Sequence, residues 1–110
     1  GHDMTNKFTP GPWHIVQKTV YSLMVDDNHK STMRNRFSAK VTFDKECTNE
    51  ESDANVLLIA AAPDLLAAMQ AFLTYDRNEN DDSISLMMNY DRALQLAKAA
   101  IIKATGSTDK

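Results

Sequence analysis

The sequence predicts a single α+β domain, with a small and mainly antiparallel sheet of three to four strands packed on two to three C-terminal helices. The chain of 110 residues has the length of one domain. Strand-forming residues gather between residues 13 and 43, whereas apolar residues at helical spacing follow from residue 54 onward. Between these regions, residues 47–52 are rich in helix-capping residues and acids. Strands therefore precede helices, an order typical of α+β domains.

The predicted domain covers residues 4–106. Residues 1–3 precede a methionine and are expected to be a cloning remnant, and residues 107–110 are expected to form a frayed tail. Apolar residues make up 43% of the chain and charged residues 25%, the composition of a folded globular protein. The longest apolar run, residues 56–63, is far shorter than the roughly 20 residues that cross a bilayer. We therefore expect no membrane partner. The lone Cys47 cannot form an internal disulfide, which fits a reducing compartment, so we expect a cytoplasmic protein.

The N-terminal half begins with a turn at residues 9–13, Thr-Pro-Gly-Pro-Trp, in which proline and glycine suit the corner positions. Two strands are predicted at residues 13–17 and 20–25, joined by a short turn near Lys18. A third strand is predicted at residues 37–43, where apolar and polar residues alternate. Its apolar members are Phe37, Ala39, Val41 and Phe43. This alternation predicts one buried face and one solvated face.

Two helices are predicted on either side of Pro63. Thr48 with Glu51 three residues later forms a capping pattern for the first helix, and Ser52 is the alternative cap. Pro63 lacks an amide proton and disfavours helical geometry at the preceding residue, so one helix is expected to end there and another to begin. The second helix carries an apolar stripe that must pack on something. Its members are Leu65, Leu66, Met69, Phe72 and Leu73.

A solvated loop is predicted at residues 76–82, followed by a last helix that begins within residues 83–89 and ends at Thr105. Gly106 is the expected C-terminal cap, because glycine accepts the left-handed conformation that ends many helices. The side chains that we expect to be buried in this helix are Met87, Tyr90, Leu94, Ala97 and Ile101.

No catalytic, metal or cofactor site is predicted. His14, His29 and Cys47 lie on separate segments without metal-ligand spacing, and an enzyme would need Cys47 to converge with one of these histidines. The three glycines are too scattered for a phosphate-binding loop. Residues 54–75 contain no lysine or arginine, so the helix-proline-helix pattern is not that of a DNA-reading motif. We therefore expect no enzymatic activity and no cofactor.

A basic segment is the candidate binding site of an otherwise acidic chain. The net charge is −3 and the pI is about 5.5, which argues against a protein devoted to nucleic-acid phosphates. Residues 29–41 nevertheless contain several cations and no acid. These cations are Lys30, Arg34, Arg36 and Lys40. The simpler interpretation is a solvated edge strand that charge protects from aggregation, and the functional one is a surface that binds nucleic acid.

Two segments resemble a pattern found in small proteins of tailed bacteriophages and prophages. Residues 9–13 match its Thr-Pro-Gly-Pro-Trp motif. Residues 55–66 match its segment Asn-Ala-x-Leu-Ile-Ala-Ala-Ala-Pro-Asp/Glu-Leu-Leu, with Val56 where the pattern has alanine. The closing Ala-Thr-Gly at residues 104–106 also fits, while residues 19–43 are unmatched. The resemblance implies a phage context, a bacterial host cell as location and this fold, and it assigns no catalytic or binding residues.

The expected function is that of a phage accessory protein that binds another protein, for instance a host or defence component in the manner of an anti-CRISPR inhibitor. Elimination leads to this expectation, because no catalytic constellation or cofactor loop is predicted. Nucleic-acid binding through the basic segment is the alternative. Met88 and Ile102 fall off the predicted buried stripe of the last helix and leave apolar surface, so a homodimer through the helices is also expected.

Overall fold

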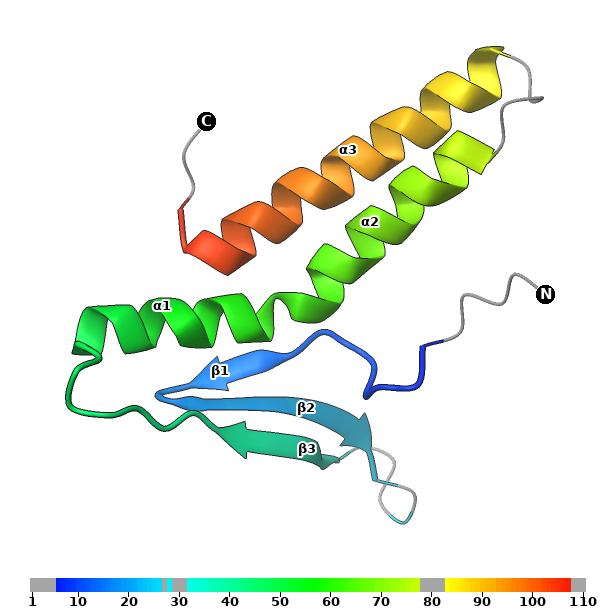
Figure 1. Ribbon diagram of the computed structural model, residues 1–110. Coiled ribbons are helices and arrows are strands. Elements are labelled where there is room, and N and C mark those ends of the chain that lie inside the picture. The colour runs from blue at the N-terminus through cyan, green and yellow to red at the C-terminus, as the bar shows by residue number, and fades with distance from the viewer. Residues whose placement is uncertain (1–5, 27, 29–31, 78–82, 108–110) are drawn as a thin grey trace.

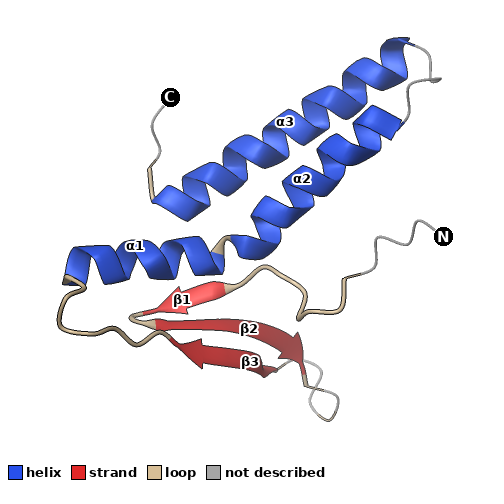
Figure 2. Ribbon diagram, viewed as in Figure 1, coloured by secondary structure: helices blue, strands red, loops and turns tan. Residues whose placement is uncertain are grey.

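The protein is an α+β domain, as the sequence predicts (Figures 1 and 2). The computed structural model describes residues 6–26, 28, 32–77 and 83–107. The strands β1 (His14–Val16), β2 (Thr19–Val25) and β3 (Met33–Lys40) form an antiparallel sheet in the order β1-β2-β3. The helices α1 (Asn49–Ala60), α2 (Ala62–Arg77) and α3 (Ser83–Thr105) follow. The predicted cloning remnant, and all of the predicted tail except Ser107, lie outside the described residues.

The third strand runs from Met33 to Lys40, so the prediction of a strand at residues 37–43 was wrong at both ends. At its start, Met33 pairs with Val25 at the end of β2. At its end, the amide of Val41 donates to the carbonyl of Lys18 at 2.7 Å, but Lys18 lies in the turn before β2. The chain leaves the sheet there because β3 can pair only where β2 offers a partner.

A β-bulge interrupts the pairing of β2 with β3. Ser22 pairs with Phe37 and Leu23 pairs with Asn35, so Arg36 is the extra residue and has no partner in the register. On either side of the bulge the alternation of faces starts afresh, because a one-residue shift moves side chains to the opposite face. The even alternation expected along β3 therefore holds only from Phe37 to Lys40.

One face of the sheet is covered by α1, and all three helices lie on this side of the sheet in Figure 1. Val20, Val56 and Ala60 form the buried core cluster of this layer. Trp13, Phe37 and Val41 are partly buried and pack against that cluster. The opposite face of the sheet carries no helix in the described part of the chain, and we call it the open sheet face (Figure 1).

Helix α1 begins as the first of the two capping patterns predicts. The Oγ1 of Thr48 accepts a hydrogen bond from the amide of Glu51 at 3.0 Å, while Ser52 is fully buried inside the first turns. A break at Ala61 separates α1 from α2, and Pro63 lies in the first turn of α2, as expected. Among the described residues no single helix is long and apolar enough to cross a membrane. Only α1 taken together with residues 62–74, bent by 48°, has that length and composition.

Helices α2 and α3 form an antiparallel hairpin that is packed on small residues (Figure 1). Its buried members are Ala68, Ala93 and Ala100. Several of the large side chains predicted to be buried are instead exposed. On α2 they are Leu66, Met69 and Leu73; on α3 they are Met87, Tyr90 and Ile101. Leu65, Phe72 and Leu94 are half-buried. The predicted faces were therefore wrong in part, because alanines let two helices approach closely and leave the larger side chains at the edges of the contact.

The hairpin projects from the sheet and makes the molecule elongated. The radius of gyration is 17.2 Å, whereas a compact chain of this length has about 13 Å. Lys103 of α3 forms an ion pair with Asp64 at the start of α2, with 2.8 Å between Nζ and Oδ2. Helix α2 extends to Arg77, so the predicted loop at residues 76–82 begins later than expected, and residues 78–82 lie outside the described part.

Candidate binding surfaces

The basic residues singled out in the sequence do not share one face of the sheet. Lys40 lies opposite Thr19, which the alternation of β2 places on the open sheet face. Arg34 lies opposite Met24, which shares the helix-covered side with the buried Val20. Arg36 is the bulge residue itself. All three cations are exposed on the edge strand β3, and their role in binding stays a prediction.

The fourth of these basic residues, Lys30, lies outside the described residues, as does His29. The bulge is the reason that Arg34 and Lys40 diverge, since plain alternation would put residues six apart on the same side. No local feature of residues 33–40 in the sequence signals this bulge.

The open sheet face carries exposed apolar side chains that sequence reasoning missed. Val16 is 54% exposed, Val25 47% and Met33 53%, and Leu23 is also exposed. The register places Leu23, Val25 and Met33 together, because Val25 pairs with Met33 and the side chains of Leu23 and Val25 alternate onto the same face. Val16 pairs with Thr19 at the other end of β2. A signal was available in β2, where Tyr21, Leu23 and Val25 make the second face of the strand as apolar as the first.

An aromatic pair lies on the same open face. The rings of His14 on β1 and Tyr21 on β2 have centroids 5.3 Å apart and are tilted by 39°. Tyr21 lies two residues from Thr19, the register partner of Lys40. Apolar, aromatic and cationic groups are therefore neighbours on this surface.

A second surface feature is a groove where the N-terminal turn meets the start of α2. The turn is fixed by two hydrogen bonds: Trp13 Nε1 donates to the carbonyl of Thr9 at 3.0 Å, and Ser22 Oγ donates to that of Pro10 at 3.1 Å. A Cβ added to Gly11 would approach Cβ of Pro63 to 3.2 Å. The two segments singled out in the sequence are thus in direct contact.

The groove is mainly apolar. A cavity of about 540 Å³ is lined by residues of both segments, and an adjoining one of about 270 Å³ lies beside Phe8, Trp13 and Leu66. The rings of Phe8 and Trp13 meet edge to face with centroids 6.3 Å apart. Among the described residues that line the groove, Asp64 is the one carboxylate, and it is paired with Lys103. These groups can receive an apolar side chain, and they hold no acid-base pair.

Cys47 is not set up as an activated nucleophile. Burial of the thiol raises its pKa, the carboxylate of Glu51 raises it further, and the ammonium group of Lys18 acts in the opposite direction. A thiolate is the reactive form, so a raised pKa makes this thiol less reactive at neutral pH. Its Sγ contacts the carbonyl of Thr48 at 3.6 Å, while His14 contacts Tyr21. Within the described ranges, no three of the His, Cys, Asp and Glu side chains gather as metal ligands.

The fold and these surfaces define a small α+β domain with an open apolar sheet face. A family model described as Salmonella phage P22 protein Y8K6 matches residues 4–108. The chain therefore belongs to this phage protein family, which confirms the phage context that the resemblance implied. The match also includes residues 19–43, which the resemblance left unmatched. Searches of curated proteins and of solved structures found no match to this chain.

Proposed function

We propose that this protein is a phage accessory protein that binds another protein, a host or defence component such as a CRISPR effector, through its open sheet face. The observation that carries the proposal is the set of exposed apolar side chains on this face. Leu23, Val25 and Met33 are exposed together at one end of this face, and Val16 is exposed at the other end, while helix α1 covers the opposite side of the sheet. Contiguous apolar surface on a soluble domain is typical of an interface.

The cations of β3 suggest what the partner surface looks like. Lys40 lies on the open face and Arg36 at the bulge beside it, so the apolar centre has a basic edge. A partner with an apolar patch beside acidic side chains would match both parts. In such an interface the apolar centre supplies most of the affinity, whereas the charged rim mainly sets association rate and specificity.

Two glutamate variants test the apolar centre. The tagged chain and its Val25→Glu and Met33→Glu variants are expressed in phage-infected cells, and co-purifying proteins are quantified. Both positions are exposed, so the variants should fold, and circular dichroism checks this. A partner found this way is purified and titrated against each variant. We expect the substitutions to weaken its binding about tenfold or more, because each buries an unpaired carboxylate at an interface.

The matched control is Leu58→Glu on α1, which makes the same kind of change at an exposed apolar site away from the sheet. It should bind the partner as the unmodified chain does. Recovery of no protein above background contradicts the proposal, and so does a partner that all three variants bind equally well.

Nucleic-acid binding is the second candidate, and the His14–Tyr21 pair beside Lys40 favours it. Exposed aromatic rings next to cations are the elements that stack bases and neutralise phosphates. The test is fluorescence anisotropy with single-stranded and duplex oligonucleotides at low salt. Binding that falls with salt and is lost in Tyr21→Ala and Lys40→Ala supports this candidate. Binding that is absent, or that is unchanged in both Tyr21→Ala and Lys40→Ala, ends it.

A further inference from the structure

Helix α3 has a second apolar face that the fold covers only in part, since Met87, Tyr90 and Ile101 are exposed while Leu94 and Ala97 are half-buried. Met87, Tyr90, Leu94, Ala97 and Ile101 recur at spacings of three and four, which is the heptad pattern of a helix that packs on another helix. The buried residues Ala93 and Ala100 lie on a different face of α3, and α3 packs against both α2 and α1. At 3.6 residues per turn the two faces are about a quarter turn apart. Met87 is 64% exposed and Ile101 55%.

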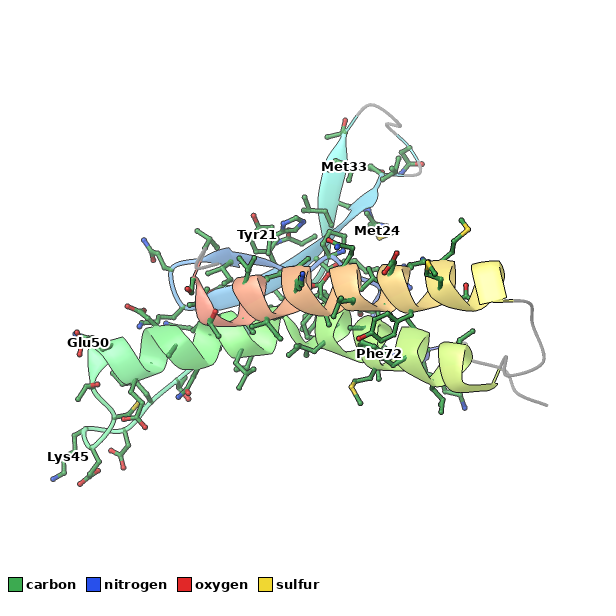
Figure 3. The ribbon with its side chains drawn as sticks, turned by 90° about the horizontal axis from the view of Figure 1, so that it is seen from above. Tyr21, Met24, Met33, Lys45, Glu50 and Phe72 are labelled. Atoms are coloured by element: carbon green, nitrogen blue, oxygen red, sulfur yellow. The ribbon has the colours of Figure 1, made fainter. Side chains whose placement is uncertain are left out.

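Helix α2 extends this face across the hairpin. The rings of Phe72 on α2 and Tyr90 on α3 are in contact, with centroids 6.2 Å apart. The side of α2 that carries Phe72 therefore lies next to the side of α3 that carries Tyr90. Met69, 67% exposed, precedes Phe72 by one turn and lies on the same side of α2. In Figure 3, Phe72 is seen between α2 and α3, away from Met24 and Met33 at the end of the sheet. We call this surface the hairpin face, made by Met69, Phe72, Met87, Tyr90, Leu94 and Ile101.

The charges beside the hairpin face indicate what covers it. Asp91 and Lys98 lie on its outer edge along α3, one heptad apart and at nearly equal distances from Leu94. Met87 and Ile101 are equally spaced about the same point. In an antiparallel helix pair related by a two-fold axis, a residue before the axis lies opposite the residue equally far beyond it. With the axis beside Leu94, Asp91 of one copy therefore lies opposite Lys98 of the other, and the reverse pair forms as well.

We propose that a second copy of this chain packs on the hairpin face, with its α3 antiparallel to the first and the two-fold axis beside Leu94. The two hairpins then form a four-helix arrangement. In this arrangement α3 contacts α2 through its alanine face and the second α3 through its heptad face, since each helix of a bundle has two neighbours. The open sheet face is not used, so the assembly is independent of the proposed partner binding.

This arrangement differs from the homodimer expected from the sequence. Met88 and Ile102 prompted that expectation, and both are exposed, but they lie about a third of a turn away from the heptad stripe. They are not part of the proposed contact.

Reversing the charge of Lys98 or of Asp91 tests both the dimer and the antiparallel orientation of its two α3 helices. Sedimentation equilibrium of the full chain gives the dimer dissociation constant. Lys98→Glu puts two like-charged pairs across the interface, and we expect it to raise that constant about tenfold or more. Asp91→Lys should do the same. The double variant restores opposite charges and should return the constant to within about threefold of the original. Arg92→Glu, on a different side of α3, is the control that should change little.

A cross-link tests the register separately. In a Cys47→Ser background, Leu94→Cys places the only thiol beside the proposed axis, and mild oxidation should link two chains. Ala99→Cys, on another side of α3, should not link. An unmodified chain that stays monomeric up to about 1 mM overturns the proposal. So does a dimer whose dissociation constant is insensitive to both single charge reversals.

Discussion

Cys47 shows how a single side chain responds to the start of a helix. It lies directly before Thr48, the N-cap of α1, a place where the positive end of the helix dipole would favour a thiolate. Burial and the neighbouring Glu51 nevertheless raise the pKa of the thiol, and the ammonium group of Lys18 opposes them with a smaller effect. The residue type and its position beside a helix start therefore do not predict its reactivity.

The first prediction concerns the titration of this thiol. The rate of iodoacetamide alkylation, followed by mass spectrometry across pH, should reach its midpoint above the ordinary thiol pKa of 9.0. Glu51→Gln should lower the midpoint, because it removes a carboxylate that disfavours the thiolate, and Lys18→Gln should raise it. The thiol of the unfolded chain ionises at lower pH, so the contribution of Cys47 to stability is lost as pH rises from 9.0 through the higher pKa of the folded chain. A midpoint below 9.0 contradicts this account.

Among the elements, α3 shows that an apolar pattern does not identify its own partner. Its heptad stripe of large residues suggests a buried face, yet the hairpin buries the alanine face instead. Both faces of α3 are apolar, and which of them is buried depends on the side chains of α2 that lie opposite. Helix α2 offers Ala68, and small residues on both helices permit a closer approach.

The second prediction compares the two faces of α3. Ala100→Leu should lower the free energy of unfolding by about 1 to 3 kcal/mol, because it overpacks a fully closed contact. Ile101→Ala should cost less than about 1 kcal/mol in the monomer, because more than half of that side chain is already exposed. Urea denaturation at a concentration where the chain is monomeric measures both. The reverse order of costs would mean that the sequence-predicted face is the buried one.

The third prediction concerns the bulge in β3. Deleting Arg36 should change the free energy of unfolding by no more than about 1 kcal/mol, because Asn35 and Phe37 already pair with adjacent residues of β2. Deleting Ser38 is the control. It forces either Phe37 or Ala39 onto the wrong face and should cost more than about 2 kcal/mol, since Phe37 packs on Trp13 with 5.0 Å between ring centroids. Equal costs for the two deletions would contradict this assignment of the bulge.

At the scale of the whole molecule, one contact lies where the hairpin leaves the sheet. The turn at residues 9–13 leads into β1, and its Gly11 lies against Pro63, where α2 begins. Ser22 of β2 and Trp13 secure the same turn through hydrogen bonds. Two segments about fifty residues apart in the chain thus set how the hairpin leaves the sheet.

The fourth prediction tests this contact. Gly11→Ala should lower the free energy of unfolding by about 1 to 2 kcal/mol, because the new methyl group meets the rigid ring of Pro63. Pro63→Ala in the same chain should relieve part of the loss, and a double-mutant cycle gives the coupling energy. Thermal or urea unfolding of the four chains provides the measurement. A coupling energy near zero would show that the two residues do not press on each other.

The sequence by itself determined the local features of this protein. The cap at Thr48, the break before Pro63, the end of α3 at Thr105 and the positions of β1 and β2 all depend on a few adjacent residues, and each was predicted. The α+β class follows from the order of those elements. These features are fixed by backbone hydrogen bonding and φ preferences within a turn or two of chain.

The tertiary structure decided which surfaces are covered. The end of β3 depends on where β2 stops, the faces of Arg34 and Lys40 depend on the bulge, and the buried face of α3 depends on the alanine of α2. The candidate surface could be predicted only in part: its cations were evident, but the open apolar face requires knowing that helices cover just one side of the sheet. Burial is a property of two elements in contact, and a single stretch of sequence specifies only one of them.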